Sequence, residues 1–220
     1  TWLDCDISGQ TSDDNAIAAI WEIIQPSFYN CGLRKNGSTD NRTQRAHRDH
    51  SGAIIGVDEN EVCELYRSST DVKFYLVGYI KSGAVFLTNA TDLSLSTTGT
   101  WLDLSALPSG AYGGFIEVHS SGAYRYGLRK NGSSKEIYRR VYRHSWFFVE
   151  CDEDQIIEGK IENTGADFYL VGYAIELGPD MHVNIGGAWK TVAGVWCNIG
   201  GAWKQASEVH VNIGGTWKKS

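Results

Sequence analysis

The sequence predicts an all-β protein made of two tandem antiparallel β-sandwich domains and a C-terminal tail of β-hairpin repeats. Two observations carry this prediction. Gly32–Ser38 recurs letter for letter as Gly127–Ser133, 95 residues later, and Phe74–Tyr79 recurs as Phe168–Tyr173, 94 residues later, so a long unit is duplicated. The composition agrees, because 25 Gly, 8 Trp and 11 Tyr accompany 1 Met and 3 Pro, which is typical of many short strands joined by tight turns.

The repeats divide the 220 residues into three parts. We expect one sandwich over residues 1–95, a second over residues 96–178 and the tail over residues 179–220. Units of this size bury enough surface to be stable. No apolar run approaches the roughly 18 to 20 residues that span a bilayer. We therefore expect a soluble protein without membrane insertion.

The charge is unevenly distributed along the chain. The net formal charge is −6, yet residues 181–220 contain four Lys and one Glu, so the tail is basic and the rest is acidic. This asymmetry favours weak docking of the tail on an acidic protein surface. It does not indicate nucleic acid as a partner.

Comparison of the two copies decides between helix and strand at the start of the duplicated unit. Ala16–Ile23 has the apolar spacing of a helix when it is taken alone. Its counterpart, Ala111–Val118, contains two adjacent glycines and four β-branched or aromatic residues, which favour a kinked strand. If the copies share a fold, both segments are strands, and no long helix is expected.

The following strands are separated by recognisable turns. Asn36-Gly37 and Asn131-Gly132 follow the segments Phe28–Arg34 and Ala123–Arg129. Asn-Gly is typical of a type I′ turn, so both are predicted to be hairpin tips. The apolar runs Gly52–Ile55 and Trp146–Val149 are predicted to be buried strands, each followed by an acidic turn and further strands. Each copy then has about six or seven short strands, as in an antiparallel sandwich.

The tail repeats a unit of fourteen residues three times, with the pattern Val/Cys-Asn-Ile-Gly-Gly-x-Trp-Lys. Apolar residues alternate with polar ones, which predicts a strand. Gly-Gly then supplies a turn, and the tryptophan lies on the return strand. Three such hairpins are too small for a core of their own, so we expect them to pack on the second sandwich or on other subunits.

Each sandwich resembles the end of a jelly roll of the complement-globular-head and tumour-necrosis-factor type. The resemblance covers residues 16–80 and 111–174 and rests on the order of the strands and on the closing strands with Val77-Gly78-Tyr79 and Val171-Gly172-Tyr173. Members of that family form trimers and bind through loops or outer faces, so the resemblance implies oligomerisation and recognition. The tail is similar to Gly-Gly-x-Trp-Lys repeats of bacteriophage tail and other virion proteins.

Candidate contact residues lie where the two copies differ. Divergent loops on a common frame are typical of changed specificity, and equally of drift in solvated loops. The variable stretches contain Asn41, Arg42, Arg45 and His47 in the first copy and Tyr138, Arg139, Arg140 and Tyr142 in the second. Equivalent positions of the tail hold Trp189, Trp203 and Trp217, either as platforms for sugar rings or as packing between hairpins.

No motif predicts an enzyme, a metal site or a cofactor. The stretch from His47 to His50 is the nearest to a metal site, but the second copy keeps only His144. Glu64 and Glu158 recur without a partner base, and no phosphate loop, nucleophile elbow or zinc signature occurs. The five Cys lack CxxC spacing and align with bulky or apolar residues, which indicates packing, while a Cys5–Cys31 disulfide stays open.

These observations predict a non-enzymatic structural or attachment protein of a virus particle, located in a bacteriophage tail fibre, head fibre or capsid decoration. We expect a homo-oligomer, with a trimer favoured, that contacts a host-surface glycan or neighbouring virion proteins. One alternative is a secreted carbohydrate-binding or self-assembling protein of a cell surface. Another is a glycan-cleaving enzyme, whose turnover would be lost when Glu64 or Glu158 is replaced.

Overall fold

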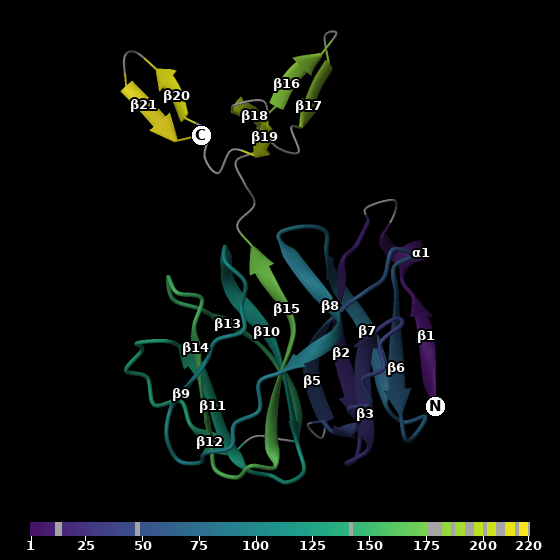
Figure 1. Cartoon of the computed structure of the whole chain (residues 1–220). Helices are drawn as coiled ribbons and strands as arrows, with labels where there is room; N and C mark the ends of the chain where they lie inside the picture. Colours follow the sequence, from purple (N-terminus) through teal and green to yellow (C-terminus); the bar gives the residue numbers. More distant parts are fainter. Residues whose placement is uncertain are drawn as a thin grey trace. The chain divides into compact units, whose positions relative to one another are not determined.

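The computed structural model describes residues 1–11, 15–46, 49–140 and 143–175, together with short strands of the tail. The chain forms two units, Thr1–Glu176 and Leu177–Ser220. In the first unit, antiparallel sheets face each other in two sandwiches (Figure 1), so the predicted all-β fold with two β-sandwiches is confirmed. No helix in the described parts of the chain is long and apolar enough to cross a membrane.

The first sandwich is built from strands β1 to β7. One sheet has the order β1-β6-β3-β4, and the other has the order β5-β2-β7. Trp21, Ile23, Leu33 and Cys63 are buried in the core of this sandwich. A single short helix, α1 (Ser8–Thr11), is described in this unit. The strands are β1 (Trp2–Asp6), β2 (Ala18–Gln25), β3 (Asn30–Lys35), β4 (Gln44–Arg45), β5 (Asp49–Gly56), β6 (Val62–Arg67) and β7 (Lys73–Ile80).

The second sandwich repeats this arrangement and adds one strand. Its sheets have the orders β12-β11-β14-β9 and β13-β10-β15-β8. Ile116, Val118, Ile157 and Phe168 are buried in its core. The strands are β8 (Ala84–Asp92), β9 (Leu102–Leu104), β10 (Ala111–Ser120), β11 (Arg125–Lys130), β12 (Arg139–Arg140), β13 (His144–Glu150), β14 (Ile157–Ile161) and β15 (Ala166–Ile175).

The segment with helix-like spacing is a strand in both copies, as the comparison of the repeats predicted. β2 lies between β5 and β7, and β10 lies between β13 and β15. In β2, Trp21 and Ile23 are buried, while Glu22 and Ile24 are more accessible. Pairing on both edges therefore overrides the local helical spacing, because side chains alternate between the two faces of a strand.

The prediction of type I′ hairpin tips was wrong. Gly37 and Gly132 have φ angles of 78° and 74°, but neither preceding Asn has a positive φ, whereas a type I′ turn requires both. The next strand, β4, pairs with the far end of β3, at Asn30 and Cys31, so the chain does not form a tight hairpin.

The Asn side chains of these turns have another use. Asn36 Nδ2 donates to Asp58 Oδ2 at 2.7 Å, and Asn131 Nδ2 donates to Asp152 Oδ2 at 2.6 Å. Each Asp also accepts backbone N–H groups of its own turn, such as that of Val62 in the first copy. The acidic turn is therefore held against the Asn-Gly turn, which explains why both sequences recur.

The cysteines act mainly as packing residues. Cys31, Cys63 and Cys151 are buried and free, and Cys5 is half-buried and free, so the structure contains no Cys5–Cys31 disulfide. Cys5 instead lies opposite Cys63 in the β1–β6 pair. The side chain of Cys197 lies outside the described residues.

β8 makes the two sandwiches different. By sequence it belongs to the predicted first part, residues 1–95, yet it pairs antiparallel with β15 of the second sandwich. Tyr169 lies opposite Asp92, and Tyr173 lies opposite Val85. The outer edge of β15 is therefore covered, whereas β7, its counterpart, is an edge strand among the described residues.

In the tail, each fourteen-residue unit contributes two short antiparallel strands. None of the side chains in the tail is described, so the expected packing of the hairpins stays a prediction. The strands are β16 (His182–Ile185), β17 (Ala188–Thr191), β18 (Trp196–Ile199), β19 (Ala202–Gln205), β20 (His210–Ile213) and β21 (Thr216–Lys219), which pair in that order.

Candidate functional site

The two sandwiches meet through a buried cluster of charged groups. Arg42, in the loop before β4, places Nη2 2.7 Å from Glu117 Oε2 of β10 and Nη1 2.9 Å from Asp40 Oδ2. His144 of β13 lies 2.7 Å from Glu117 through Nε2 and 3.0 Å from the carbonyl oxygen of Cys31 through Nδ1. The Glu117 and His144 side chains are fully buried. The repeats are thus joined by hydrogen-bonded charges, the form in which buried charge is tolerated.

The groups of this cluster keep one another charged. Burial alone would lower the pKa of His144, but its hydrogen bonds to Cys31 and Glu117 and the charge of Glu117 raise the pKa to about 9. Burial would raise the pKa of Glu117, but His144 and Arg42 hold it below its ordinary value. The ring centroid of His119, also in β10, lies 5.6 Å from that of His144. Burial and the charge of His144 lower the pKa of His119 to about 4. His144 is therefore a cation and His119 is neutral near pH 7.

Apolar side chains also join the two sandwiches. Phe86 of β8 and Phe115 of β10 pack with ring centroids 4.9 Å apart. Both belong, with Val171 and Ala174, to the buried core that includes the first sandwich. Gly56 of β5 makes room for this contact, because a Cβ there would overlap the Cβ of Phe86. The outer face of the β13-β10-β15-β8 sheet is thus the docking face of the second repeat.

The first repeat carries the same Glu–His pair on its own outer face, where it is exposed. His50 Nε2 lies 2.6 Å from Glu22 Oε1. In the duplicated sequence these residues correspond to His144 and Glu117. The His50 side chain is 66% exposed, whereas that of His144 is 0% exposed. The Glu22–His50 pair thus repeats the Glu117–His144 pair at a surface that no other repeat covers in the described structure.

Apolar residues accompany this exposed pair. Tyr75 and Val77 of β7 correspond to Tyr169 and Val171. Arg42 lies 4.4 Å from the ring centroid of Tyr169, and Val171 is buried, but Val77 is 59% exposed. We call the surface formed by Glu22, Ile24, His50, Tyr75 and Val77 the β2 face. The β2 face therefore carries the same kinds of residue as the docking face, but its residues are exposed.

The surface that receives the docking face also has an open counterpart. On the second sandwich, a groove of about 360 Å³ lies between β11, β12 and β13, and we call it the β11 groove. Ile137, which corresponds to Arg42, is 62% exposed there. The correspondence is structural, because a Cβ at Gly32 would overlap the carbonyl oxygen of Arg42, and one at Gly127 would overlap that of Ile137. Phe147, Phe148, Arg139 and Glu150 also line the groove.

The structure separates the predicted contact residues of the first copy. Arg42 is used within the chain, in the buried cluster. Asn41 is exposed, and its Oδ1 accepts a hydrogen bond from Trp2 Nε1 at 3.1 Å. Arg45 is exposed on β4. His47 lies outside the described residues. Ligand contacts by Asn41 and Arg45 stay predictions.

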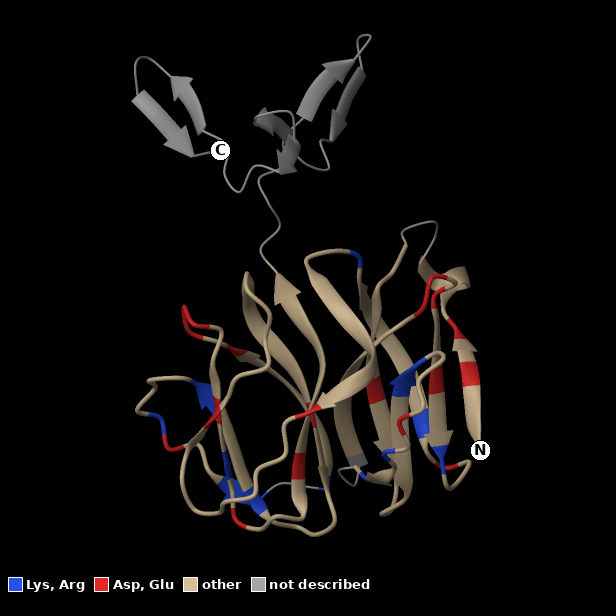
Figure 2. Ribbon diagram, viewed as in Figure 1, with Lys and Arg blue, Asp and Glu red and all other residues tan. Residues whose placement is uncertain are grey.

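Of the predicted contact residues of the second copy, Arg139 lines the β11 groove, and Tyr138 and Arg140 are its neighbours in the sequence. Arg139 and Arg140 form β12 and are exposed, and Figure 2 shows basic residues gathered around this strand. Tyr138 is partly buried, with Lys160 Nζ 4.9 Å from its ring centroid. Tyr142 lies outside the described residues, as do the side chains of Trp189, Trp203 and Trp217.

The carboxylates considered for acid–base chemistry are engaged in salt bridges. Arg34 donates to both oxygens of Glu64, each at 2.8 Å. Arg129 pairs in the same way with Glu158, at 2.7 and 3.2 Å. A tryptophan covers each guanidinium group, with Trp101 4.0 Å from Arg129 and Trp2 in the same role in the first copy. In the parts of the chain that are described, no group of three or more His, Cys, Asp or Glu residues is placed to hold a metal ion.

Neither Glu117 nor His144 is among the contact residues predicted from the sequence. The signal was present, because a Glu and a His recur in both copies within otherwise apolar strands, at Glu22 and His50 and again at Glu117 and His144. A charged residue inside an apolar strand requires a partner. The sequence does not show that the partner, Arg42, comes from the other repeat.

Comparison with known proteins adds no family. No protein-family model matches the sequence, and no curated protein or solved structure shows significant similarity to it.

Proposed function

We propose that this protein is a non-enzymatic structural subunit that self-associates head to tail, with the β2 face of one copy seated on the β11 groove of the next. One observation carries the proposal. The two repeats of one chain already meet through an interface of this type. The β2 face of the first repeat corresponds to the docking face, the β11 groove of the second repeat corresponds to the surface that receives it, and both are exposed. Exposed apolar patches of this kind are typical of interaction sites.

The residues of the two surfaces are compatible. Within the chain, Arg42 contacts Tyr169. In the proposed interface the corresponding residues are Ile137 and Tyr75, which would lie against each other. Arg139 lines the groove and supplies a cation for Glu22, so the charge lost with Arg42 has a substitute. Glu150 replaces Gly56 in the groove. Within the chain, Gly56 leaves room for Phe86 of β8. No described strand on the β2 face corresponds to β8, so the proposed interface has no counterpart of Phe86 and can accept the larger Glu150.

The proposed interface joins two different surfaces. Such an interface closes into a ring when the rotation between copies permits it, and otherwise extends into a filament. A ring of three would be the trimer favoured by the sequence. Together with the jelly-roll-like repeats and the virion-like tail, this supports a role in a bacteriophage fibre or capsid decoration.

The mass of the native protein over a range of concentrations tests self-association. We expect species larger than a monomer, and a monomer at micromolar concentration would overturn the proposal. Val77→Asp on the β2 face and Ile137→Asp in the β11 groove should each give monomers. Mixing these two variants should restore a 1:1 dimer, because one intact β2 face then meets one intact groove.

The mixing experiment distinguishes this geometry from a symmetric dimer. In a face-to-face dimer one of the two variants would remain dimeric, and mixing would not create a new species. Leu3→Asp is the matched control, since Leu3 is 55% exposed and lies on neither surface. The Leu3→Asp variant should have the same native mass as the unchanged protein at each concentration.

The setting is tested separately. Co-purification of the protein with virus particles would support the virion assignment. Glycan binding by a monomer, lost in Trp189→Ala and Trp203→Ala variants, would instead favour a secreted carbohydrate-binding protein.

A further inference from the structure

Among the described residues, no strand lies along the outer edge of β7, whereas the same edge of its counterpart is covered. In the second sandwich, β8 and the residues after it pair with β15, and the backbone N–H of Leu93 donates to the carbonyl oxygen of Phe168 at 2.8 Å. Phe74 of β7 corresponds to Phe168. No described strand pairs with this edge of β7. An open edge presents unpaired backbone groups and is a template for another strand.

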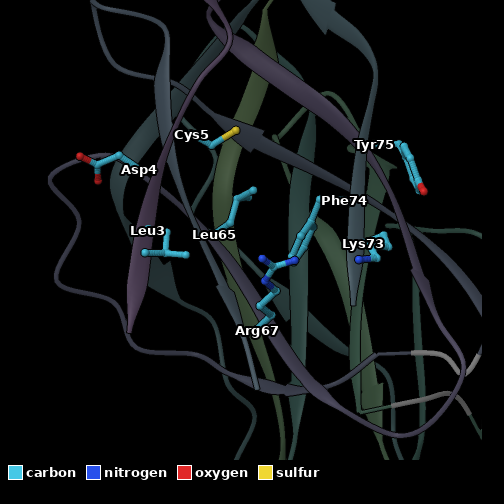
Figure 3. A pocket seen from close by; sticks show the side chains of 8 residues that line it. All are labelled: Leu3, Asp4, Cys5, Leu65, Arg67, Lys73, Phe74 and Tyr75. Atoms are coloured by element: carbon cyan, nitrogen blue, oxygen red, sulfur yellow. The ribbon is translucent and has the colours of Figure 1, made fainter. Parts of the chain in front are cut away.

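An apolar pocket lies beside this edge. It has a volume of about 290 Å³ and extends from β7 to β1 and β6. Leu3, Cys5, Leu65 and Phe74 provide its apolar lining, and Figure 3 shows Leu65 and Phe74 in the middle of the view with Leu3 to one side. Edge and pocket together offer both backbone pairing and a place for apolar side chains.

The same region of the second sandwich is filled. Leu87, Leu93 and Leu95, which belong to β8 and the segment after it, pack against that core. Phe168 is fully buried there, whereas Phe74 is only partly buried. The second repeat therefore shows which chemistry completes this side of the sandwich.

We propose that the β7 edge and this pocket form an acceptor site for an extended, leucine-bearing strand of another polypeptide, with the chemistry of residues 84–96. Its backbone pairs antiparallel with β7, as β8 pairs with β15. Leucines at alternate positions, like Leu93 and Leu95, enter the pocket because residues two apart lie on one face of a strand. This is recognition by strand addition.

Charge further specifies the incoming strand. In the second sandwich Asp92 lies near Asp167, and burial together with the charge of Asp92 raises the pKa of Asp167 despite a hydrogen bond from Ser94. Lys73 occupies the position of Asp167 in the first repeat, and Arg67 also lines the pocket. An acidic residue at the position of Asp92 would therefore meet attraction at the first repeat instead of repulsion.

A labelled synthetic peptide with the sequence of residues 84–96, titrated against the full chain, tests this proposal. We expect saturable binding and new hydrogen-exchange protection of the amides of β7. Leu93→Ser with Leu95→Ser in the peptide should weaken binding at least tenfold. Leu3→Glu in the protein should do the same, and Ile137→Asp, in the other sandwich, should leave binding unchanged.

A charge exchange provides a second, independent variant. Lys73→Glu should weaken binding of the peptide, and Asp92→Lys in the peptide should restore it. Absence of binding at millimolar peptide, or binding that is indifferent to both sets of changes, would overturn the proposal. Leu102 of β9 is the counterpart of Leu3 in the second sandwich. Loss of binding in Leu102→Glu but not in Leu3→Glu would also overturn the proposal, because the peptide would then be displacing β8. Since Ile137→Asp blocks self-association but not this site, failure of one proposal is distinguishable from failure of the other.

Discussion

Arg42 and Glu117 form a salt bridge of 2.7 Å that joins the two repeats, and the carboxylate is completely buried. The loop of one repeat thereby neutralises a charge in the central strand of the other. The pair explains why Arg42, in a variable loop, does not face solvent.

Replacing Arg42 should destabilise the protein strongly. We expect Arg42→Met to lower the free energy of unfolding by about 3 to 5 kcal/mol, because Glu117 would keep a buried charge without its second cation. Arg45→Met is the matched control, since Arg45 is exposed on β4, and it should change stability by less than about 0.5 kcal/mol. Chemical denaturation measures both. Equal effects of the two variants would contradict the assigned role.

Stability should fall as the solution becomes alkaline. The pKa of His144 is about 9 in the folded state and 6.5 when unperturbed, so its stabilising contribution is complete below pH 6.5 and is lost as pH rises through 9. The loss amounts to roughly 3 kcal/mol at most. The free energy of unfolding, measured across this range, should decrease with pH. His144→Gln should remove this pH dependence, whereas His50→Gln, in the exposed pair, should retain it. A slope unchanged by His144→Gln would disprove this assignment.

Stability should also fall in acid, through Glu117. Its pKa lies below the ordinary 4.5, so its contribution is present above that pH and is lost as pH falls through the folded-state value. Glu117→Gln should reduce the acid dependence of unfolding, while Glu22→Gln, in the exposed pair, should leave it in place. An acid limb that persists in Glu117→Gln would assign the effect to other carboxylates.

Gly56 should tolerate no side chain. A Cβ at this position would overlap Phe86, so Gly56→Ala should cost about 1 to 3 kcal/mol of stability. Gly52→Ala in the same strand is the control, because the nearest atom to its Cβ would be 3.8 Å away. Thermal unfolding of both variants checks the difference. If the two behave alike, the close approach of β8 to β5 is not required.

Arg129 should not be replaceable by lysine. Its guanidinium group pairs with both oxygens of Glu158 and lies 4.0 Å from the ring centroid of Trp101, a geometry that an ammonium group cannot reproduce. We expect Arg129→Lys to cost about 1.5 to 3 kcal/mol, measured by denaturation. Arg140→Lys, on the exposed β12, should be close to neutral. A neutral Arg129→Lys would indicate that the pair contributes little.

Much of the architecture was accessible from the sequence because the chain contains its own comparison. Setting Ala16–Ile23 beside Ala111–Val118 predicted strands where local spacing favoured a helix, and it identified the cysteines as packing residues. The prediction failed at Asn36-Gly37, because the Asn side chain binds Asp58 and the chain continues into a long loop. Turn propensity describes only neighbouring residues, whereas this contact spans 22 positions.

By itself, the sequence determined the duplicated units, their strands and the alternation of buried and exposed positions, since these depend on local periodicity and on the recurrence of residues. Only the tertiary structure decided that β8 joins the second sandwich and that Arg42 meets Glu117 and His144. The physical reason is that strand pairing and buried charge are satisfied by whichever partners the packed chain brings together. The same packing covers one repeat's docking face and one sheet edge, and in the described part of the chain the corresponding face and edge of the other repeat are not covered by a strand.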